Sequence, residues 1–166
     1  MLDFIGGWKE VMNWLMDQPK EKKFKISEWH PKRSRSANSY FHVLSDRIAD
    51  ARTLRGDTIS KAAEKNELIG KYGQMMLLPN GQRAVFKSNV PPDAAKEWEG
   101  EHLFFLKYDE DPNVYWYRLM RHTATYDSRE MAALIDGTIE DAKAWGVETL
   151  TPEELKRLEG YEKSLH

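Results

Sequence analysis

Apolar residues recur every three or four positions in several stretches of the chain, and this spacing is typical of a helix with one buried face. In the first half of the chain it predicts helices over residues 3–17, 36–54 and 58–69. Gly56 is a suitable end for the second helix, and the third is expected to stop near residues 70–73. The predicted buried faces of the first two helices are Ile5, Trp8, Met12 and Leu15, and Ala37, Tyr40, Phe41, Leu44, Ile48 and Ala51.

Two further helices with strong start signals are predicted near the end of the sequence. Asp127, followed by Glu130, is the beginning of a capping box for a helix that Gly146 closes. Thr151-Pro152-Glu153-Glu154 combines an N-cap, a proline in the first turn and an acidic third position, and predicts a last helix to about residue 163. The expected buried face of the helix after Asp127 is Met131, Leu134, Ile135, Ile139, Ala142 and Trp145.

Alternating or continuous apolar runs between these helices predict short strands. Residues 74–78 and 82–87 flank Pro79-Asn80-Gly81, and Asn-Gly between apolar runs is a strong hairpin signal because both residues tolerate a positive φ. Residues 103–108 and 114–121 predict a second pair of strands. A short helical turn is expected from Pro91-Pro92 to Gly100, and a further strand at 23–29.

The order of elements, with helices before and after a group of strands, favours an α+β fold in which helices flank a small antiparallel meander sheet. The length of 166 residues fits a single domain over 1–166, with an N-terminal helix in 1–20 and a C-terminal helix in 151–166. The chain has no cysteine, so disulfides and thiolate metal sites are excluded. Neither a signal peptide nor an apolar membrane span is recognised, and a cytoplasmic location is therefore expected.

Charge is distributed unevenly, although the net charge is only −2. Residues 20–35 hold seven Lys or Arg residues against two Glu, a balance of +5, which leaves −7 for the rest of the chain. A basic segment in an otherwise acidic protein directs polyanions to one region. A solvated loop beside a strand would have the same composition, so charge alone does not decide between the two interpretations.

The strongest candidate binding site is the basic approach to the second helix. Ser34 or Ser36 can cap this helix, whose first backbone amides are unpaired and suit a phosphate. Arg side chains match phosphate oxygens in two places, and the amide of Asn38 in the first turn can contact sugar, phosphate or a base edge. An ordinary capped helix with basic residues before it is the alternative. The predicted nucleic-acid contacts here are Lys23, Lys25, Lys32, Arg33, Ser34, Arg35 and Asn38.

The run 114–121 is a second candidate, because aromatic residues interleaved with arginine stack bases and pair with phosphates. Arg118 is the residue predicted to contact nucleic acid in this run. Aromatic strands are more often part of a core or an interface. Both faces of the run are apolar, so a central strand or a dimer contact is also consistent with it.

The search for catalytic chemistry gives little. No two of the five His residues are spaced as metal ligands on one helix face, and no P-loop, G-x-S-x-G or G-x-G-x-x-G motif is present. We expect no cofactor and no catalysis. A metal-dependent nuclease remains the alternative, with Asp109, Asp111 and Asp136 as carboxylates that the fold would have to bring together.

Several short motifs resemble the phage NinB family, also called Orf. Arg33-Ser34 followed by Asn38 is similar to the R-S-x-x-x-N opening of that family, and residues 126–131 and 144–150 are similar to its closing helix and Gly-Val exit. Residues 65–66 and 72–73 look like versions carried by phages of Gram-positive bacteria. The likeness extends over about 24–155, whereas the N-terminal helix is distinct.

This resemblance implies a recombination mediator that binds single-stranded DNA without catalysis. It also implies a homodimer, contact with the host single-strand-binding protein, loading of a recombinase and a location in the host cytoplasm. By motif position, Arg33, Ser34 and Asn38 would contact DNA. A third hypothesis is an interaction protein whose acidic surface mimics DNA and inhibits a host defence enzyme.

Overall fold

A computed structural model of the chain describes residues 5–26, 35–99 and 102–157. The chain divides into two compact units, residues 1–30 and 31–166, and each is described by itself. Within the described part of the chain, no helix is both long enough and apolar enough to cross a membrane.

The first unit contains helix α1 (Trp8–Met16) and an irregular segment that follows it. Gly7 stands at the N-cap, and its backbone N–H donates to the Glu10 carboxylate at 2.7 Å. The rings of Trp14 and Phe24 meet edge to face, with centroids 5.4 Å apart. No residue of α1 is buried, so the predicted buried face is wrong for this helix as the structure describes it.

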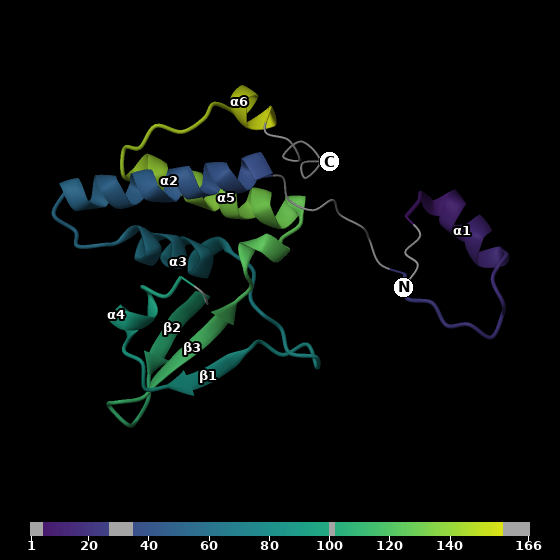
Figure 1. Cartoon of the computed structure of the whole chain (residues 1–166), viewed down its shortest axis with the longest axis horizontal. Coiled ribbons are helices and arrows are strands. Elements are labelled where there is room, and N and C mark those ends of the chain that lie inside the picture. Colours follow the sequence, from purple (N-terminus) through teal and green to yellow (C-terminus); the bar gives the residue numbers. More distant parts are fainter. Residues whose placement is uncertain (1–4, 27–34, 100–101, 158–166) are drawn as a thin grey trace. The chain divides into compact units, whose positions relative to one another are not determined.

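The second unit has a layer of helices above a small sheet (Figure 1). Helices α2 (Arg35–Leu54) and α5 (Ser128–Ala144) run side by side, and α3 (Lys61–Tyr72) lies beneath them. The short helix α6 (Pro152–Lys156) follows α5. The predicted buried faces of α2 and α5 meet in the core, which confirms both predictions. The buried core residues include Phe41, Leu44, Ile48, Leu68, Ile69, Leu134, Ile135 and Ile139.

The helix starts follow the capping signals in the sequence. The backbone N–H of Glu130 donates to Asp127 at 2.8 Å, and that of Asp127 donates back to Glu130 at 3.0 Å, which completes a capping box. Thr151 caps α6 in the same way through Glu154. These hydrogen bonds satisfy backbone donors that the first turn of a helix leaves free, and so fix where α5 and α6 begin.

One arginine near the end of α2 ties that helix to α3. Arg52 Nη1 lies 2.7 Å from Glu64 and 3.0 Å from Glu67, and its Nη2 lies 2.6 Å from Asp57. Glu64 is only 2 % exposed, and burial raises the pKa of its carboxyl group although Arg52 opposes this. Removing Arg52 would leave a buried carboxylate without its cation, so the cluster holds the α2–α3 connection in place.

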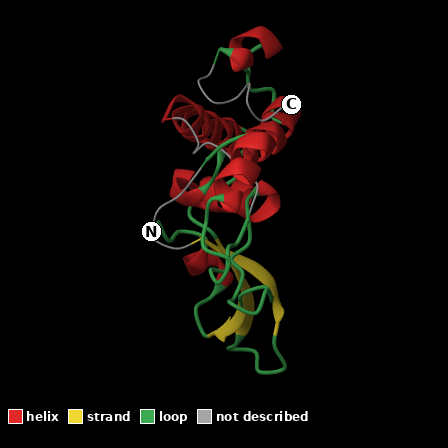
Figure 2. Ribbon diagram, turned by 90° about the vertical axis from the view of Figure 1, so that its right-hand side faces the viewer, coloured by secondary structure: helices red, strands yellow, loops and turns green. Residues whose placement is uncertain are grey.

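Among the described residues, strands β1 (Val85–Ser88), β2 (His102–Tyr108) and β3 (Tyr115–Met120) form one antiparallel sheet. The strand order is β1-β3-β2, so β3 is central and pairs with both neighbours, as the apolar character of both its faces allowed. Figure 2 shows this sheet at one end of the unit and the helices at the other. The α+β class with helices flanking a small antiparallel sheet is thus confirmed. The predicted meander is wrong, because β1 pairs with β3 and not with β2, the next strand in the chain.

Short irregular elements complete the sheet region. Gly81 has φ +80° in the predicted Asn-Gly turn, and the backbone N–H of Leu78 donates to Gln82 O at 2.8 Å across it. The predicted strand 74–78 contributes only isolated bridges, Met75 to Met120 and Leu77 to Arg83. Helix α4 (Pro92–Ala95) precedes β2, and a 3₁₀ turn, η1 (Thr123–Thr125), follows β3.

A glycine within α3 brings the helical layer directly onto the sheet. A Cβ atom on Gly70 would lie 1.9 Å from Cδ2 of Phe104, so only glycine fits against this ring. The carbonyl of Gly70 accepts a hydrogen bond of 2.8 Å from Arg118 Nη2. The prediction that α3 stops near 70–73 is refined, because Gly70 lies inside the helix and Gly73 is its C-cap.

Other boundaries differ from the sequence predictions for local reasons. Helix α1 begins at Trp8 rather than at residue 3, after two glycines that disfavour helix. Residues 23–26 form no strand, while 27–29 lie outside the described residues. Helix α6 is described to Lys156, and the rest of the predicted last helix lies outside the described part.

Gly70→Ala should destabilise the protein by about 1–3 kcal/mol, because the added methyl group overpacks the contact with Phe104. Chemical denaturation followed by circular dichroism measures the change. Lys61→Ala on the exposed side of α3 is the control and should change stability by no more than about 0.5 kcal/mol. Equal effects from the two substitutions would show that the close approach at Gly70 is unimportant.

Candidate nucleic-acid interface

The register of the sheet places different chemistry on its two faces. Residues opposite one another in antiparallel strands project to the same side. Lys87 of β1 and Lys107 of β2 therefore flank Trp116 of β3, and Arg118 lies beside Phe104 on the same side. We call the set Lys87, Lys107, Trp116 and Arg118 the cationic face.

Trp116 is the centre of the cationic face. The Lys87 ammonium lies 4.8 Å from the centroid of its indole ring, and that of Lys107 lies 5.5 Å from it. Both distances are within the range of cation–π attraction. An aromatic ring with a lysine on each side combines a surface for stacking a base with charges for the phosphates on either side of that base.

Asp109 holds this arrangement in place. Its Oδ2 accepts a hydrogen bond of 2.6 Å from the indole Nε1 of Trp116 and lies 2.8 Å from Lys87 Nζ. The hydrogen bond from Lys87 lowers the pKa of Asp109 to about 2, so the carboxylate stays charged at neutral pH. With its N–H bonded to Asp109, the indole does not offer its polar edge to a ligand.

Arg118 is built into the protein more firmly than a surface arginine. Its guanidinium stacks over Phe104 at 4.8 Å and donates to Gly70 O. Burial lowers its pKa from the ordinary value, and the nearby charge of Arg83 adds to this effect. Arg118 and Arg83 thus contribute positive potential beside Trp116, with Arg118 fixed by α3.

The structure describes only some of the other residues that were predicted to contact nucleic acid. Lys23 and Lys25 are exposed in the first unit, and Lys32, Arg33 and Ser34 lie outside the described residues. Arg35 is the first residue of α2, although its side chain is not described. Because α2 begins there, Ser36 lies in its first turn rather than at its N-cap. Of the two predicted caps, Ser36 is therefore wrong, and Ser34 lies outside the described residues.

Asn38 connects the start of α2 with the turn after β3. Its Oδ1 accepts a hydrogen bond of 3.5 Å from Thr123 Oγ1, and the side chain is half-buried. Residue 123 is only three positions beyond the end of β3. The beginning of α2 therefore adjoins the end of the strand that carries Trp116 and Arg118.

A buried histidine and asparagine join α3 to β2. The amide of Asn66 donates to the carbonyls of Lys96 and Trp98, each at 2.7 Å, so its Oδ1 must accept the 2.6 Å hydrogen bond from His102 Nδ1. Burial lowers the pKa of His102 to about 4, with further contributions from His122, Lys65 and His42. The buried His102 thus joins β2 to α3 through the hydrogen bond of its Nδ1.

The acidic residues of the nuclease hypothesis do not meet. Asp109 and Asp111 lie at the β2–β3 loop, whereas Asp136 lies on α5 in the helical layer (Figure 1). Asp111 accepts the backbone N–H of Asn113 at 2.9 Å, which shapes the loop. Among the described residues, no group of three or more His, Asp or Glu side chains is placed to hold a metal ion.

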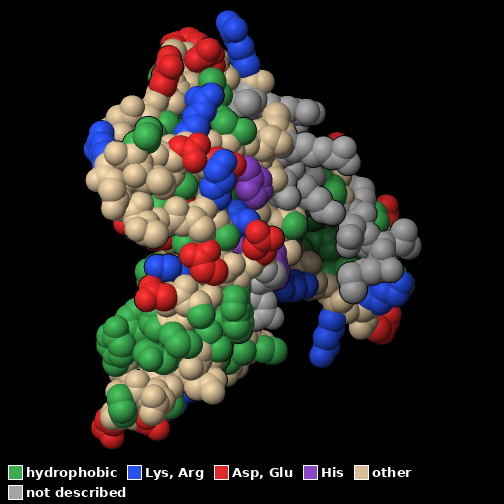
Figure 3. Space-filling model, turned by 60° about the vertical axis from the view of Figure 1, so that its left-hand side comes forward, with side chains coloured by type: hydrophobic (Ala, Val, Ile, Leu, Met, Phe, Trp, Pro, Cys, Tyr) green, Lys and Arg blue, Asp and Glu red, His purple; other side chains and the backbone are tan. Residues whose placement is uncertain are grey.

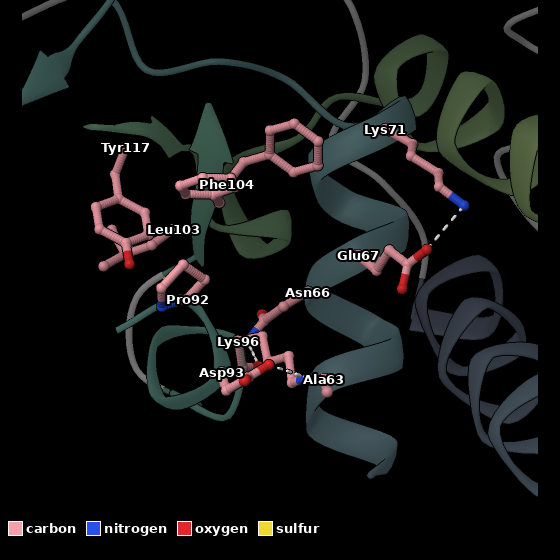
Figure 4. Close-up of a pocket in the computed structure, with 11 residues that line it drawn as sticks. Ala63, Asn66, Glu67, Lys71, Pro92, Asp93, Lys96, Leu103, Phe104 and Tyr117 are labelled. Carbon is pink, nitrogen blue, oxygen red and sulfur yellow. Dashed lines mark hydrogen bonds and ion pairs between the residues drawn. The ribbon is translucent and has the colours of Figure 1, made fainter. Parts of the chain in front are cut away.

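A pocket of about 320 Å³ lies between β2, α3 and α4 (Figure 4). Leu103, Phe104 and Tyr117 form apolar walls. At its polar borders, Lys71 Nζ lies 3.0 Å from Glu67, and Lys96 Nζ lies 2.8 Å from Asp93. The Asn66 amide is already bonded, so these borders contain paired charges and no evident nucleophile.

Sequence patterns identified Arg118 but missed Lys87, Lys107 and Asp109 as parts of the same surface. Each of the two lysines belongs to a different strand, and only the register brings them to Trp116. The register also shifts between Phe105 and Lys107, so simple alternation along β2 would place Lys107 on the wrong side. The sequence signal for these lysines is that each directly adjoins an aromatic residue, as in Phe86-Lys87 and Lys107-Tyr108.

The chain matches no family model, no curated protein and no solved structure at a significant level. The likeness of its motifs to the NinB family stays a prediction.

Stability should fall as the pH is lowered from about 6.5 to about 4 because of His102. In this window the unfolded chain protonates the histidine while the folded protein keeps it neutral, so protons favour unfolding. The loss from this group should reach at most about 3 kcal/mol.

Urea denaturation of the wild type and of His102→Gln at pH 4.5, 5.5 and 7 isolates this effect. The glutamine keeps a donor for Asn66 and does not titrate, so the variant should lose less stability than the wild type over the same pH range. Parallel losses in both proteins would contradict the assignment.

Proposed function

We propose that this protein binds single-stranded DNA and acts as a non-catalytic accessory of recombination. The observation that carries the proposal is the position of Trp116 between the ammonium groups of Lys87 and Lys107. Single-strand binding without strong sequence preference needs aromatic rings for the bases and cations for the backbone, and this face supplies both within one sheet.

The cationic face favours a single strand over a duplex. The paired bases of a duplex are stacked on one another, so an aromatic side chain can reach a ring face only where a base is unpaired. The indole N–H is bonded to Asp109 and is not available to read a base edge. The contact that remains, stacking on the ring, tolerates every base.

The basic approach to α2 extends this proposal. Asn38 adjoins the turn that follows β3, so a strand lying on the cationic face has a route towards the start of α2. Arg33, Ser34 and Arg35 precede or begin that helix in the sequence. The role in recombination, the homodimer and the contacts with a host single-strand-binding protein and a recombinase rest on the resemblance to the NinB family.

Trp116→Ala should weaken binding of a fluorescent oligothymidine by roughly 5- to 100-fold, which corresponds to the loss of one stacked base. Lys107→Ala should reduce the slope of log affinity against log salt by roughly 0.7, one phosphate contact on a single strand. Fluorescence anisotropy over a salt series measures both quantities. The same titrations with duplex DNA should show weaker binding and a smaller effect of Trp116→Ala.

Glu140→Ala, on the exposed side of α5, is the control and should leave the affinity for oligothymidine within about twofold. All variants must retain the circular dichroism spectrum of the wild type. A folded Trp116→Ala protein with wild-type affinity and an unchanged salt slope for Lys107→Ala would refute binding at this face.

The Arg33→Ala, Arg35→Ala pair tests the second part of the interface. If both arginines contact phosphates, the salt slope should decrease by about 1.4, and affinity should fall equally for all sequences. Asn38→Ala should weaken binding with little change in slope, because asparagine carries no charge. An unchanged slope in the folded double variant would remove the start of α2 from the interface while leaving the cationic face untouched.

A further inference from the structure

The face of the sheet opposite Trp116 carries a continuous row of aromatic rings. Phe86, Phe105 and Tyr108 meet Tyr117 and Tyr115 across the strands, and we call this set the aromatic ladder. Ring centroids lie 6.2 Å apart for Phe86–Tyr117 and Phe105–Tyr117, 5.1 Å apart for Phe105–Tyr108 and 5.8 Å apart for Tyr108–Tyr115.

The described structure covers the aromatic ladder at Tyr117, between Phe86 and Phe105. Ala95 of α4 and Val90 pack on Leu103 and Tyr117, and the Tyr117 hydroxyl donates to Val90 O at 2.5 Å. Rings towards both ends of the ladder stay open: Tyr108 is 67 % exposed and Phe86 is 38 % exposed. Exposed apolar surface of this kind, rimmed by polar residues, marks an interaction site.

The residues around the aromatic ladder are mainly acidic. Tyr108 leads directly into the loop with Glu110 and Asp111, and α4 with the turn after it contains Asp93, Glu97 and Glu99 against the single cation Lys96. Asp93 is 94 % exposed at its side chain. Figure 3 shows hydrophobic side chains gathered over this part of the molecule, with acidic side chains beyond them at both ends.

The two faces of the sheet therefore differ in their charged neighbours. Lys87, Lys107 and Arg118 make one face suitable for phosphates, whereas the segments that border the aromatic ladder in the chain carry mainly carboxylates. A ligand of the aromatic ladder must combine apolar groups with positive charge. A guanidinium group meets both requirements, because it stacks on tyrosine rings and pairs with carboxylates.

We infer that the aromatic ladder is a docking surface for a basic, extended segment of a partner protein, one that presents arginine and apolar residues on the same side. Arginine side chains stack on Tyr108 and Tyr115 and pair with Glu110 and Asp93 at the two borders, while apolar side chains contact Phe86 and Phe105. Aromatic and arginine contacts of this type dominate the energetics of protein interfaces. This surface is separate from the cationic face and does not depend on DNA binding.

An Arg-Leu peptide of sequence Arg-Arg-Leu-Leu-Arg-Arg, with both ends blocked, presents arginine and leucine on each side when extended, and it tests the inference by isothermal titration calorimetry with the full chain. A Glu-Leu peptide of sequence Glu-Glu-Leu-Leu-Glu-Glu has the same apolar content and the opposite charge. The Arg-Leu peptide should bind about tenfold more tightly than the Glu-Leu peptide. Tyr108→Ala should weaken its binding by about tenfold, and so should the pair Asp93→Lys, Glu110→Lys.

The matched control is the pair Glu140→Lys, Glu148→Lys, which makes the same change in net charge on exposed residues in and after α5. It should leave peptide binding within about twofold. Equal affinity for the two peptides, or equal loss in the control pair, would refute a charge-selective site. Sedimentation that shows self-association of the wild type, lost in Tyr108→Ala, would also overturn the inference, because the surface would then be an interface between copies.

Discussion

The contact between Gly70 and Phe104 is the constraint on which the rest of the second unit depends. It brings the backbone of α3 onto the sheet, because any side chain at position 70 would occupy the space of the ring. The same contact holds Arg118, which stacks on Phe104 and donates to the Gly70 carbonyl. One close approach therefore fixes the sheet against the helices and places a cation beside Trp116.

The distribution of polar contacts separates structural groups from candidate binding groups. Asn66 and His102 use their hydrogen-bonding capacity within the protein, and Arg52 is fully occupied by the carboxylates of the α2–α3 connection. The lysines beside Trp116 differ in that their side chains lie at the surface, and Lys87 is also paired with Asp109.

The two faces of the sheet carry different side chains because of strand alternation and register. Alternation along β3 sends Tyr115 and Tyr117 to one side and Trp116 and Arg118 to the other, and the register of β1 and β2 supplies matching neighbours. The register shift after Phe105 is essential, since it returns Tyr108 to the side of Tyr115 and leaves Lys107 opposite Trp116. Phosphates would then be attracted to the cationic face, and a basic polypeptide to the aromatic ladder.

The sequence by itself determined the elements that depend on neighbours along the chain. The buried stripes of α2 and α5, the capping boxes at Asp127 and Thr151 and the Asn80-Gly81 turn arise from interactions over three or four residues, so their patterns are visible without a fold. The tertiary structure decided that Gly70 lies inside α3 against Phe104, and which lysines meet Trp116. Those outcomes depend on contacts between residues far apart in the chain and on a strand register that a local pattern does not contain.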